Sequence, residues 1–408
     1  MSCMLFLLVW AVLQSTPLPF GWLAHPVWDR LAALDIPAQP TLSVAPAVTR
    51  GAIPGLALPF LVFAAMILLC QERREALFAW KALTILGMVL AALAVVLEAF
   101  FPDIKFFSNY EVGHGSFNGF LVNRNTTAAF LGLAAFATAG WLMLPRPKGR
   151  REWPKPTEVA AVGWSRVALA GILFLMIIVL ITTRSRAGTT LVLLCLTLAF
   201  AAILIARADT HHDAEAPPVR NLGTGVRLAL LVATTVGLFI AFGEPVISRI
   251  GGEPEDGRWC AWAATLQIIA ERPVVGLGFG TFADAFPQYR DPDCLGTAGA
   301  WTRAHNSHLE FLAGMGLVGG LAVATAMAIM IRVLANGVRS RKSLQAIPIL
   351  TLGALAFVAL HSVVDFPLQI PGVSLYAAAL LGAGCAVSIL TRQPGGSRSK
   401  RRSISGRR

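Results

Sequence analysis

Residues 304–331, AHNSHLEFLAGMGLVGGLAVATAMAIMI, place two histidines at the border between a polar stretch and a long apolar run. Beyond Glu310 the run has no charged residue up to position 331. About 20 consecutive apolar residues are enough for a helix to cross the roughly 30 Å hydrocarbon core of a bilayer. The stretch therefore predicts a membrane helix over 309–331, with His305 and His308 at one of its water-facing boundaries.

The composition of the whole chain agrees with this prediction. Of 408 residues, 56% are hydrophobic and 14% are charged, with a mean hydropathy of +0.66, whereas soluble domains carry about 25% charged residues. Because only helices and closed barrels satisfy their backbone polar groups in lipid, the long apolar runs predict an all-α membrane protein. The net charge of +12 would suit a nucleic-acid-binding protein. The basic residues lie in short clusters between apolar runs, however, so we expect no nucleic acid partner.

The apolar runs predict a polytopic bundle of about ten membrane helices, with residues 1–391 forming a single membrane domain. The first run has about a dozen apolar residues and reaches only about 20 Å at 1.5 Å per residue. It is tilted, lies partly in the interface, or is what remains of a longer N-terminus. The predicted helices cover residues 1–14, 54–70, 77–98, 121–144, 163–182, 187–206, 226–243, 309–331, 346–364 and 372–391.

The distribution of Lys and Arg predicts the orientation of these helices. Basic residues concentrate in the connections that share a side with the N-terminus, and above all in the tail at 392–408. By the positive-inside rule we expect both termini in the cytoplasm, and the tail as a disordered anchor near anionic lipid. The opposite, outer side then carries three connections, 15–53, 99–120 and 244–308.

The connection at 244–308 is the longest of the three, and loops of this length usually have a function or a fold of their own. Within it, RWCAWAATLQIIAERP at 258–273 has apolar residues at helical spacing. We expect an amphipathic helix on the outer leaflet, with Trp259 near the lipid headgroups. Cys260 and Cys294 both fall in this loop and could form a disulfide in an oxidising compartment, although the sequence does not give their distance.

Arginines on the outer side run against the charge bias and mark a candidate binding site. A single one is explained by snorkelling or helix capping, but several meet at one water–membrane boundary. Guanidinium groups bind phosphate oxygens through paired hydrogen bonds, so a lipid-linked diphosphate is the ligand that we expect. The candidate residues are Asn123, Arg124 and Asn125 of NRN, Arg184 and Arg186 of TRSRAG, Arg258 and Arg303.

Three interpretations of the two histidines are open: metal ligands, a catalytic pair, or the polar start of a helix. A zinc site needs three or four ligands, and Glu310 falls on another helix face than His305, so we expect no metal. A neutral imidazole beside arginines is a suitable general base or phosphate ligand, and we predict this role for His305. For His308 we favour a solvated position at the helix start, with Asn306 and Ser307 as caps.

Weaker patterns nearby have structural explanations. HSVVDFPLQIPG at 361–372 places His361 and Asp365 one turn apart, where they could pair at the site or form a buried structural hydrogen bond. GLGFG at 276–280 lacks a surrounding βαβ unit, so it predicts a tight turn rather than a dinucleotide site. The glycines of 304–320 are expected to permit close helix packing.

Several of these motifs occur in the order seen in a known family. A PLP in a Trp-containing outer loop is followed by NRNTTAAF, TRSRAG, RWCAWAATLQIIAERPVVGLGFGTF, HNSHLEFLAGMGLVGG and HSVVDFPLQIPG, which together cover most of residues 15–375. The chain resembles the O-antigen ligase/polymerase superfamily of bacterial membrane glycosyltransferases. The resemblance implies a helix bundle of the GT-C type in the inner membrane, with its active site facing the periplasm.

The resemblance also implies a reaction. The donor would be a glycan on undecaprenyl diphosphate, and the acceptor a hydroxyl of lipid A–core or of another lipid-linked glycan. By similarity Arg186, Arg258 and His305 are the catalytic residues: the arginines would bind the diphosphate, and the histidine would help to deprotonate the acceptor or bind diphosphate. Asn306, Asp365 and the remaining candidates would contact substrate. Such enzymes invert the anomeric centre and need no metal or other cofactor.

Other functions stay open at this stage. Within the superfamily the chain could be an O-antigen ligase, an O-antigen or exopolysaccharide polymerase, or a protein O-oligosaccharyltransferase. We favour the first two, because no pilin-binding appendage is visible. Outside the superfamily, a solute transporter is the main alternative. Transporters place charges near the bilayer midplane and have internal repeats, whereas the charges here cluster at one boundary.

Overall fold

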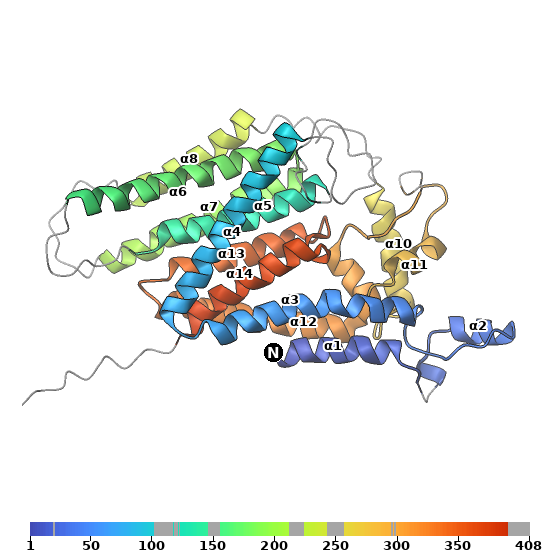
Figure 1. Ribbon diagram of the computed structural model, residues 1–408. Coiled ribbons are helices and arrows are strands. Elements are labelled where there is room, and N and C mark those ends of the chain that lie inside the picture. Colours follow the sequence, from blue (N-terminus) through green and yellow to red (C-terminus); the bar gives the residue numbers. More distant parts are fainter. Residues whose placement is uncertain are drawn as a thin grey trace, which may run out of the picture.

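The structure is a computed structural model that describes residues 1–18, 21–101, 117, 121, 123–145, 156–211, 224–242, 257–294, 297 and 299–390. Within these residues the chain forms thirteen α-helices, two short 3₁₀ helices and no β-strand (Figure 1). The predicted all-α fold is therefore confirmed.

Seven of the described helices are long and apolar enough to cross a membrane. They are α3 (Pro46–Leu69), α4 (Arg73–Phe100), α5 (Arg124–Met143), α6 (Pro156–Thr182), α7 (Arg186–His211), α12 (Ser307–Ser340) and α14 (Pro371–Ile389). Three further apolar helices, α1 (Ser2–Ser15), α8 (Thr224–Phe242) and α13 (Ala346–His361), complete a set that coincides with the ten predicted segments. The chain is thus a multi-pass membrane protein. The predicted tail at 392–408 and most of the connection at 99–120 lie outside the described residues.

Helices α5 and α14 form the core of the bundle, and most of their side chains are buried. Helix α14 packs against α3, α4, α5, α12 and α13 (Figure 1). Small residues bring the helices together: a Cβ at Gly140 of α5 would lie 2.5 Å from the indole ring of Trp80 in α4. The Trp80 N–H donates to the Ala137 carbonyl oxygen at 2.9 Å. Close contact and interhelical hydrogen bonds hold helices together in lipid, where the hydrophobic effect contributes little.

Helix α12 is broken at Gly316, where φ is +64° and ψ is −172°. An irregular segment of the long outer loop runs along the break, and the Leu277 N–H donates to the Ala313 carbonyl oxygen at 2.9 Å. A Cβ at Gly316 would lie 2.2 Å from the Val274 carbonyl oxygen. For this glycine the expectation of close helix packing is therefore wrong, because the backbone that approaches it belongs to a loop.

The predicted tight turn at GLGFG is confirmed. Gly276, Gly278 and Gly280 have φ values of +72°, +109° and +83°, a region that glycine occupies without steric cost. A Cβ at Gly276 would lie 2.4 Å from the Gly314 carbonyl oxygen. The turn therefore presses directly on the broken part of α12.

Helix α1 closes the other side of the break and is an integral part of the bundle. Gln14 is fully buried and donates to the carbonyl oxygens of Gly314 and Val275 at 2.8 and 2.7 Å. The Trp10 N–H donates to the Met315 carbonyl oxygen at 3.1 Å. The carbonyl groups freed by the break thus find partners within the protein, as irregular backbone at membrane depth requires.

One end of the bundle, on the right in Figure 1, gathers the candidate residues. Helices α5, α7 and α12 begin there and α13 ends there. The smaller elements of the outer connections are η1 (Gly21–Leu23), α2 (Val27–Ala33), α10 (Arg258–Glu271), α11 (Phe282–Tyr289) and η3 (Pro367–Gln369). Helix α10 confirms the helix predicted within 258–273. One of its faces packs on α11 and α12, and the other face exposes Trp259 and Leu266.

Candidate active site

The candidate site centres on His305, the residue before the cap of α12. Its φ of +53° puts the backbone in the left-handed region, a type of strain that costs roughly 1–3 kcal/mol and clusters at functional sites. The imidazole lies at steep angles to the rings of Trp301 and Phe366, with centroids 5.3 and 4.8 Å away. Its Nδ1 lies 3.6 Å from Oδ1 of Asp365. The strained backbone and the aromatic rings together aim the imidazole at a carboxylate.

Asp365 is buried, and its Oδ1 accepts the Phe366 N–H at 2.8 Å. Its Oδ2 has no hydrogen-bond partner within the described part of the chain. Burial alone raises the pKa of this carboxyl, but His305, His361 and the Phe366 amide outweigh burial and hold the pKa below its ordinary value. Asp365 is therefore ionised at neutral pH, and its charge favours the His305 tautomer with the proton on Nδ1. The 3.6 Å separation exceeds a hydrogen bond, so a small side-chain movement is needed to form one.

His361 occupies the buried last position of α13. Its ring stacks on Phe357 with centroids 5.6 Å apart, and neither ring nitrogen has a hydrogen-bond partner among the residues that the structure describes. The sequence left open a pairing or a structural hydrogen bond between His361 and Asp365. The Asp365 N–H donates to the His361 carbonyl oxygen at 3.0 Å, but their side chains form no hydrogen bond with each other. Asp365 lies against His305, and His361 is an electrostatic neighbour.

Arg258, the first residue of α10, reaches the same turn. Its Nη1 donates to the carbonyl oxygen of Val364, the residue directly before Asp365, at 3.2 Å.

A disulfide lies two positions after Arg258. It joins Cys260 to Cys294 across 34 positions of sequence, so the two cysteines whose pairing the sequence left open are bonded. Closing a loop of this length stabilises the folded protein by about 3–4 kcal/mol in the chain-entropy account. The disulfide therefore fixes the start of α10 and, with it, Arg258.

Of the two predicted caps of α12, Asn306 is confirmed, whereas Ser307 is the first residue of the helix. Asn306 is buried, and its Oδ1 accepts two N–H groups of the first turn at 3.1 and 3.0 Å. The Ser307 N–H donates to the Ser362 carbonyl oxygen at 2.8 Å, which ties the start of α12 to the turn after α13. His308 is exposed, and its Nε2 hydrogen-bonds with the Ala359 carbonyl oxygen at 2.9 Å. His308 is thus a surface residue of the helix start, as predicted.

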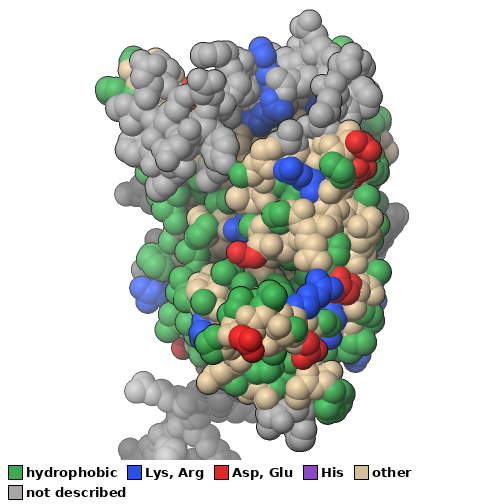
Figure 2. Space-filling view, turned by 90° about the vertical axis from the view of Figure 1, so that its right-hand side faces the viewer, with side chains coloured by type: hydrophobic (Ala, Val, Ile, Leu, Met, Phe, Trp, Pro, Cys, Tyr) green, Lys and Arg blue, Asp and Glu red, His purple; other side chains and the backbone are tan. Residues whose placement is uncertain are grey.

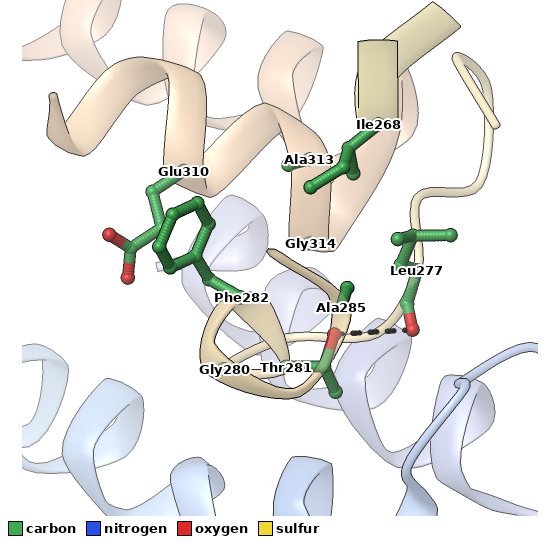
Figure 3. A pocket seen from close by; sticks show the side chains of 9 residues that line it. All are labelled: Ile268, Leu277, Gly280, Thr281, Phe282, Ala285, Glu310, Ala313 and Gly314. Carbon is green, nitrogen blue, oxygen red and sulfur yellow. Dashed lines mark hydrogen bonds between the residues drawn. The ribbon is translucent and has the colours of Figure 1, made fainter. Parts of the chain in front are cut away.

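Arg303 and Glu310 form an ion pair beside His305. Nη1 of the arginine lies 3.0 Å from Oε1 of Glu310, and Oε2 accepts the Ala304 N–H at 2.8 Å. The Glu310 side chain is only 6% exposed and lines a small pocket next to Phe282 (Figure 3). From the sequence, Glu310 is a candidate only as a metal ligand. A carboxylate inside an apolar run indicates a buried group that needs a partner, and this feature of the sequence could have predicted the ion pair.

The remaining predicted residues lie at the starts of α5 and α7. Asn123 caps α5, and its Oδ1 accepts N–H groups of Asn125 and the following residue at 2.9 Å. Arg124 is the first residue of the helix. Arg184 has a φ of +55° in the turn before α7, and Arg186 is exposed at the first position of that helix.

Gly188 brings these two helix starts together. A Cβ at Gly188 would lie 2.6 Å from the Cβ of Ala128 in α5 and 2.8 Å from Oγ of Ser185. Adjacent helix N-termini carry partial positive charge, which adds to the charge of the guanidinium groups. Helix α13 packs on both α5 and α7 and leads into the turn that holds Asp365. Figure 2 shows several Lys and Arg side chains on this end of the molecule, interspersed with Asp and Glu.

The predicted residues therefore fall into two groups at the same end of the bundle. Arg258, Arg303, His305, Asn306 and Asp365 lie around the start of α12 and the turn after α13, where His305 faces Asp365 and Arg258 binds the residue before it. The second group, Asn123, Arg124, Asn125, Arg184 and Arg186, lies on the helix pair α5 and α7. Among the described residues, no group of three or more His, Cys, Asp or Glu is arranged to hold a metal ion. Guanidinium groups with an imidazole–carboxylate pair suit a site for an anionic ligand and a proton transfer.

Residues 171–324 match the sequence profile of a family described as O-antigen ligase. This span contains the TRSRAG turn, α10 and the start of α12, while NRN and the turn at Asp365 lie outside it. No match is found among the curated proteins. Residues 171–324 are therefore similar to the O-antigen ligase family, which supports the resemblance of the chain to the O-antigen ligase/polymerase superfamily.

Proposed function

We propose that the protein is a membrane glycosyltransferase that moves a glycan from undecaprenyl diphosphate to an acceptor hydroxyl. The observation that carries the proposal is the cluster at the start of α12. There, the His305 imidazole faces the buried carboxylate of Asp365, and Arg258 binds the same turn. The family match supports a reaction of the O-antigen ligase or polymerase type.

In the proposed reaction His305 acts as the base. The Asp365 carboxylate keeps the proton on Nδ1, so Nε2 is free to accept the proton of the acceptor hydroxyl. The acceptor oxygen forms a bond to the anomeric carbon of the glycan as the bond from that carbon to the phosphate oxygen breaks. Attack from the face opposite the leaving group inverts the anomeric centre.

The arginines act on the leaving group in this scheme. Negative charge builds up on the lipid diphosphate as its bond to the sugar breaks, and fixed cations stabilise that charge best where water is scarce. Arg258 and Arg186 would take this role, with Arg124 and Arg184 holding the remaining phosphate oxygens. The donor is already activated, so the reaction needs neither a nucleotide nor a metal.

We further propose that the site faces the periplasm and that the membrane is the bacterial inner membrane. The distribution of basic residues supports this orientation, since the connections at the end opposite the site are the more basic ones. The acceptor would then be lipid A–core for a ligase, or a second lipid-linked glycan for a polymerase.

Single substitutions in the source bacterium test the function. We expect Arg186→Ala, Arg258→Ala and His305→Ala each to abolish the mature glycan, while His308→Ala, at an exposed position of the same helix start, retains it. Normal glycan in all three site variants would refute the mechanism.

Deletion of the gene distinguishes the acceptors. Single repeat units on the acceptor would identify a polymerase. Accumulation of full-length chains on undecaprenyl diphosphate would identify a ligase. Loss of glycan from a protein would identify a protein transferase. A change in solute flux with unchanged glycans would instead identify a transporter.

A further inference from the structure

We propose that Glu310 is a positioning residue for His305: its carboxylate anchors the backbone at 303–304 and thereby holds the imidazole against Asp365. The inference rests on the proposed function, in which His305 is the base. In this proposal Glu310 supports catalysis without contact to substrate. Arg303, predicted to bind diphosphate, instead binds Glu310.

The backbone around His305 is fixed on both sides. On one side Oε2 of Glu310 accepts the Ala304 N–H at 2.8 Å. On the other side Asn306 caps α12, and the Ser307 N–H is bound by the Ser362 carbonyl oxygen at 2.8 Å. Between these anchors His305 has its left-handed φ of +53°, which an unrestrained histidine rarely adopts because of its Cβ.

The side chain of His305 depends on this backbone conformation. Its ring is placed between Trp301 and Phe366, and its Nδ1 lies 3.6 Å from Asp365. Release of the peptide at Ala304 would let φ return to negative values and turn the ring away from the carboxylate. The base would then lose both its orientation and its preferred tautomer.

Only a carboxylate can satisfy both of its partners at this position. Oε1 of Glu310 faces the Arg303 guanidinium at 3.0 Å while Oε2 accepts the Ala304 N–H. A glutamine has the same size but a single acceptor oxygen, and its NH₂ group would face either the guanidinium or the N–H. Because the Glu310 side chain is only 6% exposed and lies beside Phe282 (Figure 3), a hydrogen bond lost at this position is costly. The guanidinium of Arg303, predicted from the sequence to bind diphosphate, is therefore the counter-ion of Glu310.

The test compares Glu310→Gln, Arg303→Lys and the matched control Glu271→Gln, which makes the same chemical change on α10 at an exposed position. With undecaprenyl-diphosphate-linked glycan extracted from the source bacterium, we expect kcat of Glu310→Gln to fall about 10²-fold, since misplacing a catalytic group by an ångström has that effect. The KM should stay within about twofold. Arg303→Lys should retain an intermediate kcat, because lysine keeps the charge, and the control should match the unaltered protein.

A second measurement reports the position of His305 without activity. Diethyl pyrocarbonate modification is followed by mass spectrometry at His305 and at His308, which serves as the internal standard. We expect the rate at His305 to change several-fold in Glu310→Gln, with the rate at His308 unchanged. Unaltered kcat and unaltered modification of His305 would overturn the proposal.

If Glu310→Gln does not insert into the membrane, kcat and the modification rate of His305 are measured in Arg303→Met instead. An active His305→Ala variant would refute the proposed base, while the modification rate still decides whether Glu310 positions the ring.

Discussion

The Gln14 side chain of α1 donates to the carbonyl oxygen of Gly314 across 300 positions of sequence. The same amide group donates to the Val275 carbonyl, and its oxygen accepts the Phe279 N–H at 3.2 Å. One side chain thus joins α1, the GLGFG turn and the break in α12.

We expect Gln14→Ala to destabilise the protein by about 2–4 kcal/mol, because it leaves buried backbone groups without partners. Thermal unfolding in detergent should show a lower midpoint than for the unaltered protein. Gln267→Ala, at an exposed position of α10, is the matched control and should leave the midpoint unchanged. Equal midpoints for the two variants would show that the network contributes nothing to stability.

The carboxylate of Asp365 is expected to be needed for transfer. Asp365→Asn keeps the size of the side chain but removes the charge that orients His305, so the transfer rate should fall roughly 10²–10⁴-fold, the range typical of general acid–base catalysis. Because Asn is nearly isosteric, the amount of protein in the membrane should not change. A variant with full activity would mean that His305 acts without this carboxylate.

Asp365 also predicts how stability depends on pH. Its pKa in the folded protein lies below the ordinary value of 3.8, so its charge stabilises the fold at every pH above that value. This contribution is lost only as the pH falls through the lower, folded-state pKa. We expect the difference between the unfolding midpoints of the unaltered protein and Asp365→Asn to disappear as the pH falls well below 3.8. A difference that persists in such acid would contradict the assignment.

The disulfide is expected to control the position of Arg258. Cys260→Ser and Cys294→Ser should lower transfer to the same extent, and the double variant should be no worse than either, because each change breaks the same bond. Cys3→Ser, which removes a free thiol, is the control. Glycan analysis with and without reductant measures the effect. Full transfer in the reduced protein would show that the packing of α10 alone places Arg258.

The contact of Gly188 with α5 should be required to place Arg186. Gly188→Ala introduces a Cβ 2.6 Å from that of Ala128, and such overpacking typically costs about 1–3 kcal/mol. We expect lower stability and reduced transfer, with partial recovery in the double variant Gly188→Ala, Ala128→Gly. Gly171→Ala, where nothing lies within 4 Å of the added Cβ, should be neutral. Absence of recovery in the double variant would indicate that the α5–α7 contact does not matter for the site.

Local features of the site could be predicted from the sequence. The apolar runs gave the helices, Asn306 was recognised as the cap of α12, and the glycines at 276–280 were recognised as a turn, since each depends on neighbouring residues in the chain. The exposed position of His308 followed from the same helix start.

Contacts between distant segments could not be predicted. Arg258 meets Val364 106 positions away. The sequence pattern left open a pairing of Asp365 with His361, one turn earlier, whereas the imidazole nitrogen that faces its carboxylate belongs to His305. Gly316 stands in an apolar run that reads as one continuous helix, because the backbone that replaces its helical hydrogen bonds comes from another segment. Glu310 was treated as a poor metal ligand for the same reason: its partners precede the helix, and helical spacing does not describe them.

The break at Gly316 divides α12 into a short piece that carries the site and a long rod toward Ser340. Transmembrane rods adapt to membranes of different thickness by tilting. Here both pieces are hydrogen-bonded to the outer loop beside the break, the short piece through the Ala313 carbonyl oxygen and the rod through the Leu317 N–H, so the loop holds the site end of the helix in place when the rest of the rod tilts. His305 should therefore keep its geometry in thin and thick bilayers alike, and the protein should tolerate changes in lipid chain length that would disturb a site built on one continuous helix.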